Sequence, residues 1–241
     1  MIAEGASIVG TLTPCDLAVL TFDDGPTPGV TEGILDALSD EGAGATFFVL
    51  LTRARRTPEL LKRITDAGHE IALHGHDHRR LTNVPPASLP RLLKDSRDEL
   101  EQLCGSDVRW YRPTYGAQNR PLWHAARTAG LTSVLWSIEC CDWLTLPPDD
   151  YLAPVQEGSL PGSIVLLHDG FADALDGADD GSPPTLDRAR LAREVVQKAR
   201  EQSLRVFGVA DALIHSEPRW QVWLDEVRAP LAGENRLRAG Q

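Results

Sequence analysis

Short runs of β-branched and aromatic residues alternate along the chain with longer segments in which apolar residues recur every three or four positions. Side chains repeat about every 2 residues in a strand and about every 3.6 in a helix, so the runs predict strands and the longer segments predict amphipathic helices. The predicted strands cover residues 17–22, 45–50, 69–73, 108–111, 132–138, 163–167 and 205–208. The predicted helices cover residues 30–41, 58–67, 87–103, 121–129 and 186–202.

About seven such units follow one another without a second compositional block, which favours one large α/β domain. The spacing favours a barrel over an open sheet without excluding the latter. In both folds the carboxyl ends of the strands meet at one edge, where we expect the chemistry to gather. We expect a catalytic domain over residues 1–216 and a C-terminal extension over residues 217–241.

The C-terminal extension contains Trp220 and Trp223, whose spacing predicts a helical face docked on the domain. The polar, glycine-containing sequence that follows predicts a flexible end.

Composition narrows the class of protein. Of the 241 residues, 42% are hydrophobic and 24% are charged, which is typical of a globular chain and excludes intrinsic disorder. The net charge of −11 repels phosphate backbones and anionic lipids, so we expect neither a nucleic acid nor a membrane partner. No apolar run approaches the roughly 18 residues of a membrane span. Because no secretory leader is visible and the four cysteines form no disulfide framework, we expect a cytoplasmic protein.

Two adjacent carboxylates, Asp23 and Asp24, follow the predicted strand 17–22. Neighbouring carboxylates at a strand end repel each other unless a cation, an arginine or water separates them. Gly25 and Pro26 then force a turn. Taken alone this is ordinary loop chemistry, and adjacent aspartates do not fit the D-x-D spacing of an aspartyl phosphotransferase.

Three of the seven histidines, His74, His76 and His78, lie within five residues after the predicted strand 69–73. This density indicates a metal site rather than a solvated basic loop. A helical turn would place His74 and His78 on one face, whereas an extended segment would align all three. Gly75 indicates that the strand has already ended, which favours the pair. Two imidazoles and one carboxylate leave positions on a cation open for water and substrate, as hydrolysis requires.

Two further clusters follow predicted strands. Residues 112–116 combine an arginine with a tight turn whose backbone N–H groups could face an oxyanion. Residues 136–143 bring Glu139 and Asp142 beside tryptophans. Each cluster alone is as compatible with packing as with catalysis.

The last cluster follows the predicted strand 163–167 and ends in His168. The two-residue period of a strand places Leu166 and His168 on the same face. The loop over residues 170–184 is rich in Ala, Asp, Gly and Pro, which fits either a flap over the site or a solvated insertion.

Taken in order, these segments resemble the polysaccharide deacetylase family (carbohydrate esterase family 4), whose members share the NodB homology domain. The match runs from residues 21–26 to residues 167–169. The resemblance implies a distorted (β/α) barrel and metal-dependent removal of an acetyl group from an N-acetylated sugar.

The resemblance also implies a role for each matching residue. Asp23 would be the general base with Arg112 as its partner, and His168 would be the general acid, tuned by Asp142. The backbone N–H of Tyr115 would hold the oxyanion. The implied metal ligands are Asp24, His74 and His78. The implied substrate-binding residues are Pro113, Trp143 and Leu166.

Zinc is the first choice by ligand type, but two histidines and one carboxylate also suit cobalt, nickel, manganese or iron. The chain departs from the family pattern at Gly75, where Ser or Thr is usual, and at Glu139, where Asp is common. Cys140 and Cys141 follow as a further departure. These changes leave the implied catalytic set intact. They put the specificity for a polymer in doubt. A small acylated amino sugar is one alternative substrate, and the resemblance also implies amides such as a formamide, ureide or cyclic imide. A non-catalytic sugar-binding protein on the same fold is the alternative of another class.

Overall fold

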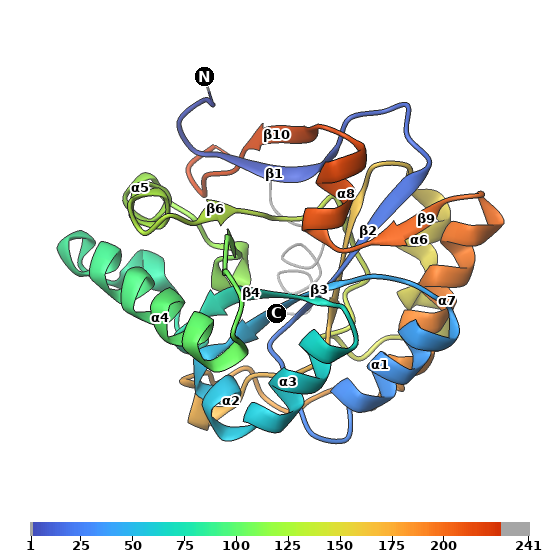
Figure 1. The fold of residues 1–241 in the computed structure, drawn as a ribbon, viewed down its shortest axis with the longest axis horizontal. Helices are drawn as coiled ribbons and strands as arrows, with labels where there is room; N and C mark the ends of the chain where they lie inside the picture. Colours follow the sequence, from blue (N-terminus) through green and yellow to red (C-terminus); the bar gives the residue numbers. More distant parts are fainter. Residues whose placement is uncertain (1, 228–241) are drawn as a thin grey trace.

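The computed structural model describes residues 2–227, which form a parallel eight-stranded sheet that curls into an incomplete barrel (Figure 1). The strands follow the order β6-β5-β4-β3-β2-β8-β7, and β9 also pairs with β2. Their bounds are β2 (Leu17–Asp23), β3 (Thr46–Leu50), β4 (Glu70–Gly75), β5 (Trp110–Tyr111), β6 (Thr132–Ser133), β7 (Ile138–Glu139), β8 (Ile164–His168) and β9 (Arg205–Phe207). The predicted α/β class and distorted barrel are confirmed.

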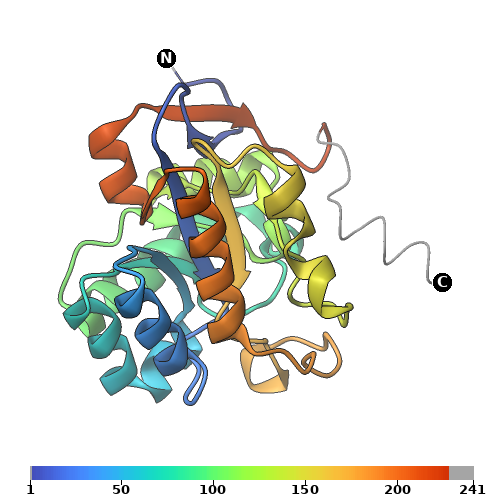
Figure 2. The same ribbon diagram turned by 90° about the vertical axis from the view of Figure 1, so that its right-hand side faces the viewer.

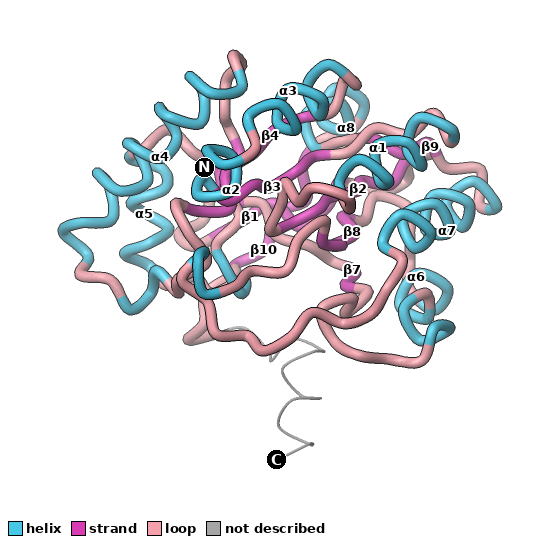
Figure 3. Tube along the Cα trace, turned by 90° about the horizontal axis from the view of Figure 1, so that it is seen from below, coloured by secondary structure: helices cyan, strands magenta, loops and turns pink. Residues whose placement is uncertain are grey.

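Helices flank the strands on the left, upper and right sides of the view from below in Figure 3. Five of them match the predicted helices: α1 (Thr31–Asp40), α3 (Pro58–Asp66), α4 (Leu89–Cys104), α5 (Arg120–Thr128) and α7 (Arg188–Glu201). The short helices α2 (Leu51–Arg56), α6 (Ala153–Glu157) and α8 (Val209–His215) were not predicted. Helix α2 continues directly from β3, so no turn residue separates the two patterns. Helices α1 and α7 lie side by side (Figures 1 and 2).

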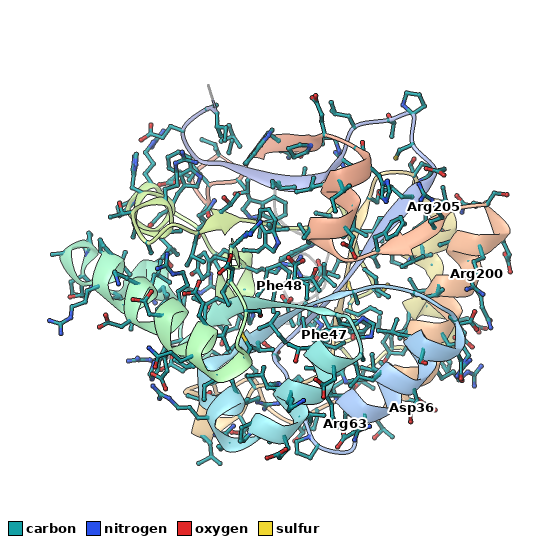
Figure 4. All side chains as sticks on the ribbon, in the orientation of Figure 1. Asp36, Phe47, Phe48, Arg63, Arg200 and Arg205 are labelled. Carbon is teal, nitrogen blue, oxygen red and sulfur yellow. The ribbon has the colours of Figure 1, made fainter. Side chains whose placement is uncertain are left out.

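The core lies on both faces of the sheet, as expected for parallel strands covered by helices. Consecutive residues of β3 show the alternation: Phe47 packs in the cluster between sheet and helices, whereas Phe48 belongs to the cluster inside the barrel (Figure 4). On the outer side, Phe47 stacks on Phe22 with 4.9 Å between ring centroids. The inner cluster also borders a buried charge, because the guanidinium of Arg112 lies 4.0 Å from the ring centroid of Phe48.

The predicted strand 132–138 is in fact two short strands at opposite ends of the sheet. Strand β6 pairs with β5 and strand β7 pairs with β8. Between them, Val134 N–H donates to the carbonyl of Tyr111, and Ser137 N–H donates to that of Ile164. Residues 134–137 thus span the gap between the sheet's two ends, which the unbroken apolar pattern did not reveal.

A separate antiparallel pair joins β1 (Ala6–Thr11) to β10 (Pro218–Val222). The prediction that Trp220 and Trp223 dock as a helical face is wrong, because Trp220 lies in β10 and pairs with Ile8. Trp223 is buried beside Trp136, with 5.3 Å between ring centroids. The predicted flexible end lies outside the described residues. None of the helices within residues 2–227 combines the length and apolarity that crossing a bilayer requires.

Candidate active site

The carboxyl ends of β2, β4 and β8 open into one pocket of about 390 Å³. Strands β2 and β8 are parallel neighbours with Asp23 opposite His168, so the two side chains reach the same pocket. The pocket also contains Asp24, His74 and His78. The structure therefore brings together the residues that the sequence placed at three separate strand ends.

Asp24, His74 and His78 form a buried cluster whose potential ligand atoms all lie within 4.8 Å of one another. Oδ1 of Asp24 is 3.3 Å from Nε2 of His74 and 3.2 Å from Nε2 of His78. The backbone of Asp24 has a φ of 74°, a left-handed conformation that costs free energy for a residue with a side chain. In this conformation, the side chain of Asp24 points toward the imidazoles of both histidines.

His74 and His78 come together by a bend and not by the expected helical turn. Strand β4 continues to Gly75, so His74 projects from the strand, and residues 76–79 then bend. A Cβ on Gly75 would lie 2.7 Å from the carbonyl oxygen of Asp77, so glycine permits this tight bend. Among the described residues, the cluster does not include His76.

The second ring nitrogen of each histidine faces an oxygen of another segment. Nδ1 of His74 lies 2.9 Å from the carbonyl oxygen of Arg112. Nδ1 of His78 lies 3.3 Å from Oδ2 of Asp180, an ion-pair distance without hydrogen-bond geometry. Burial lowers the pKa of His78, but Asp24 and Asp180 outweigh this effect and raise the pKa to about 10. Burial raises the pKa of Asp24, and the two imidazoles outweigh it and hold the pKa well below its usual value.

Arg112 is fully buried and fixes Asp23. Its Nη1 donates to Oδ1 of Asp23 at 2.7 Å and to Oγ1 of Thr21 at 2.9 Å. Its Nε and Nη2 donate to the carbonyls of Val134 and Leu135 at 3.0 and 3.2 Å. Because one carboxylate oxygen of Asp23 is held in this way, the other remains toward the cluster, 3.8 Å from Nε2 of His74.

His168 lies beside Asp23 in the β2–β8 pair and is held by Asp142. Nδ1 of His168 is 2.6 Å from Oδ1 of Asp142, and the backbone N–H of His168 donates to Oδ2 at 2.9 Å. Arg188, at the start of α7, donates to Oδ2 of Asp142 at 2.7 Å. Burial lowers the pKa of His168, but Asp142 outweighs it and raises the pKa to about 9. The imidazole is therefore protonated at neutral pH.

Aromatic residues form the pocket walls. Tyr115 has a φ of 60°, and its ring centroid lies 4.4 Å from that of His78. Trp143 lines the pocket with Leu166 and donates from Nε1 to Glu139 at 2.9 Å. Pro113 is buried and is not one of the residues that line this pocket, and its carbonyl accepts the Gly116 N–H within the turn. Its implied role in substrate binding stays a prediction.

Part of the loop over residues 170–184 lines the pocket, while most of the rest is exposed to solvent. Phe171, Ala172, Asp179 and Asp180 line the cavity. The loop is anchored by Asp176, whose buried carboxylate forms ion pairs of 2.7 Å with both Arg53 and Arg56.

Two residues of the site were not identified from the sequence. Arg188 lies in a helix with several other arginines, and Asp180 lies in an acidic loop. Neither carries a local signal that distinguishes it from a solvated charge.

Comparison with known proteins identifies the family. The fold matches that of a peptidoglycan N-acetylglucosamine deacetylase solved with a naphthyl N-hydroxybenzamide, with a TM-score of 0.73, 26% identity, and coverage of 88% of this chain and 94% of that chain. A family model described as polysaccharide deacetylase matches residues 11–134, and the chain belongs to this family. The resemblance seen in the sequence is thus confirmed.

Curated relatives agree with this assignment. The chain is 37% identical over 151 residues to a chitooligosaccharide deacetylase of Rhizobium leguminosarum bv. trifolii, covering 63% of this chain and 70% of the relative. It is 36% identical over 151 residues to a peptidoglycan N-acetylglucosamine deacetylase of Listeria monocytogenes, covering 62% of this chain and 32% of that protein.

Proposed function

We propose that this protein is a metal-dependent deacetylase that hydrolyses the acetamide group of an N-acetylated sugar. The observation that carries the proposal is the placement of Asp23 and His168 in one pocket beside the Asp24, His74 and His78 cluster. A sugar-binding protein would not need a proton acceptor and a charged imidazole beside a potential metal site. The related chitooligosaccharide and peptidoglycan deacetylases support the same reaction.

Asp24, His74 and His78 fit a divalent cation. Oδ1 of Asp24 is buried and has no hydrogen-bond partner in the described residues, which is costly for a carboxylate oxygen unless a cation satisfies it. Two imidazoles and one carboxylate suit zinc first, and also cobalt, nickel, manganese or iron. When bound, such a cation supplies Lewis acidity that polarises the amide carbonyl and lowers the pKa of water.

Asp23 and His168 would transfer the protons of the hydrolysis. Arg112 holds Oδ1 of Asp23, so Oδ2 is the oxygen that accepts a proton from the attacking water. Asp142 holds Nδ1 of His168, which leaves Nε2–H to protonate the nitrogen as the carbon–nitrogen bond breaks. Acetate and the free amine are the products.

The rest of the pocket would bind the substrate. We assign the oxyanion to the backbone N–H of Tyr115, as the family resemblance implies. Leu166 is suited to the acetyl methyl group, and Trp136 and Trp143 offer apolar faces to a sugar ring. A pocket of about 390 Å³ accommodates one sugar residue and leaves neighbouring residues of an oligosaccharide outside.

The test measures acetate release from N-acetylated chitooligosaccharides together with the metal content of the protein. We expect Asp23→Asn to retain the metal and to lose turnover, because the amide cannot accept the proton. Asp16→Asn is the matched control, since Asp16 is 67% exposed and lies outside the pocket. Turnover by Asp23→Asn at the level of the control would refute the base assignment. Metal binding without acyl release from any substrate would favour a binding protein.

A further inference from the structure

The loop over residues 170–184 contacts His78 at two points. The backbone N–H of His78 donates to the carbonyl of Asp176 at 2.7 Å. The side chain meets the loop a second time, because Nδ1 lies 3.3 Å from Oδ2 of Asp180. His74 needs no such support, because it projects from β4 and its Nδ1 faces the Arg112 carbonyl. His78 lies beyond the strand, where the bend alone leaves its ring orientation less restricted.

The loop that provides these contacts is itself fixed. Asp176 is fully buried and is bound by Arg53, Arg56 and Thr52, all from α2. Arg53 also donates to the carbonyl of Phe171 at 2.6 Å, near the start of the loop. The loop is therefore anchored to α2 by a buried ion pair to Arg53 and a partly exposed one to Arg56.

Asp180 is held on its other side by Tyr115. The Tyr115 hydroxyl donates to Oδ1 and Oδ2 of Asp180 at 3.2 and 3.1 Å, and the Tyr115 ring packs against His78. The carboxylate thus sits between a hydroxyl donor and an imidazole nitrogen. Asp179 also lines the pocket, but within residues 2–227 the carboxylate at ion-pair distance from Nδ1 of His78 is that of Asp180.

We propose that Asp180 is a positioning residue that orients the His78 ring and thereby couples the 170–184 loop to the affinity of the metal site. This inference rests on the proposed function. The carboxylate of Asp180 lies 3.3 Å from Nδ1 without hydrogen-bond geometry, so it acts on the ring through its charge. A negative charge there stabilises the ring orientation in which Nε2 faces Asp24, and it favours the tautomer whose Nε2 lone pair is free for a cation. The side chain of Asp180 is 34% exposed, so solvent partly screens this interaction.

The experiment measures zinc affinity of the chelator-stripped protein by competition with a chromophoric chelator, without substrate. We expect Asp180→Asn to weaken zinc binding by about 10- to 100-fold, the usual effect of removing an outer partner of a metal-bound histidine. Asp179→Asn is the matched control, because it removes the same charge from the neighbouring residue, and we expect zinc affinity close to that of the unaltered protein.

Two further measurements separate positioning from general stability. The melting temperature without metal should be the same for Asp180→Asn and the unaltered protein, while the increase that zinc produces should shrink. The visible spectrum of the cobalt-loaded protein should change in Asp180→Asn and not in Asp179→Asn. Tyr115→Phe, which removes only the hydroxyl that holds Asp180, should weaken zinc binding in the same direction by a smaller factor.

The outcomes distinguish this inference from the proposed function. If the unaltered protein binds no divalent metal, the proposed function fails. If it binds zinc and Asp180→Asn binds equally well, or if Asp179→Asn loses as much affinity, the positioning role is wrong. If Asp180→Asn is unstable without metal, the zinc affinity of Tyr115→Phe is the deciding measurement. A zinc affinity equal to that of the unaltered protein would then overturn the inference.

Discussion

Replacing Asp142 by Asn should move the alkaline limit of activity toward neutral pH. In the structure, burial lowers the pKa of His168, whereas the adjoining Asp142 charge is the largest influence that raises it, to about 9. The Asn side chain keeps the size but removes that charge. We expect the pKa of His168 to fall toward its ordinary value of 6.5, although Asp23 and Asp24 continue to favour the charged ring.

The size of the effect follows from protonation alone. At pH 8, a group with a pKa of about 9 is about 90% protonated, whereas one at 6.5 is about 3% protonated, a roughly 30-fold difference in active enzyme. At pH 6 a group with a pKa of about 9 is about 99.9% protonated and one at 6.5 is about 75% protonated, so the difference in active enzyme is below about 1.5-fold. If Asn also disturbs the orientation of the His168 ring, activity falls by a further factor that is the same at every pH.

The assay is kcat/KM for acetate release between pH 5 and pH 10 with the metal-replete protein. Asp150→Asn is the matched control, since Asp150 is exposed outside the pocket. The ratio of the control rate to the Asp142→Asn rate should increase steadily above neutral pH. An alkaline limb that coincides with that of the control would refute the assignment of His168 as an acid whose pKa Asp142 raises.

Two other predictions test the site. Arg112→Met should reduce the free energy of unfolding by about 3–5 kcal/mol in urea titrations, because it leaves the buried Asp23 charge without its partner; a loss below about 1 kcal/mol would contradict this. His76→Ala should leave the zinc content nearly unchanged, since the described cluster does not include His76; stoichiometric metal loss would restore the three-histidine alternative.

Much of the site could be predicted because its chemistry is local in sequence. Asp23, His74 and His168 each stand at or beside the end of a strand, and parallel strands bring such ends together whatever their exact order. The pairing of His74 with His78 was predicted for the wrong reason, since a bend and not a helical turn brings them together. The four-residue spacing of His74 and His78 identified the correct pair, although the backbone conformation inferred for the segment was wrong.

What the sequence did not reveal depends on contacts between distant segments. Arg188 meets Asp142 only because α7 begins beside the end of β8, and nothing in its own helix marks it. Asp180 differs from Asp179 only in the direction that the anchored loop gives it. The segment of β10 was predicted as a helix from the spacing of its tryptophans alone. Its conformation is set by antiparallel pairing with β1, a distant segment that the local pattern does not reveal.

The segment that closes the gap between the two ends of the sheet limits the routes by which a ligand can enter the barrel. Residues 134–137 bridge the two ends of the sheet, and the carbonyls of Val134 and Leu135 accept hydrogen bonds from the buried Arg112. Widening the barrel there would strip the guanidinium of two acceptors and release Asp23 with it. We therefore expect a ligand to enter through the mouth of the pocket. A long polymer could lie across the surface there and place a single acetamide in the pocket, without separation of the strands.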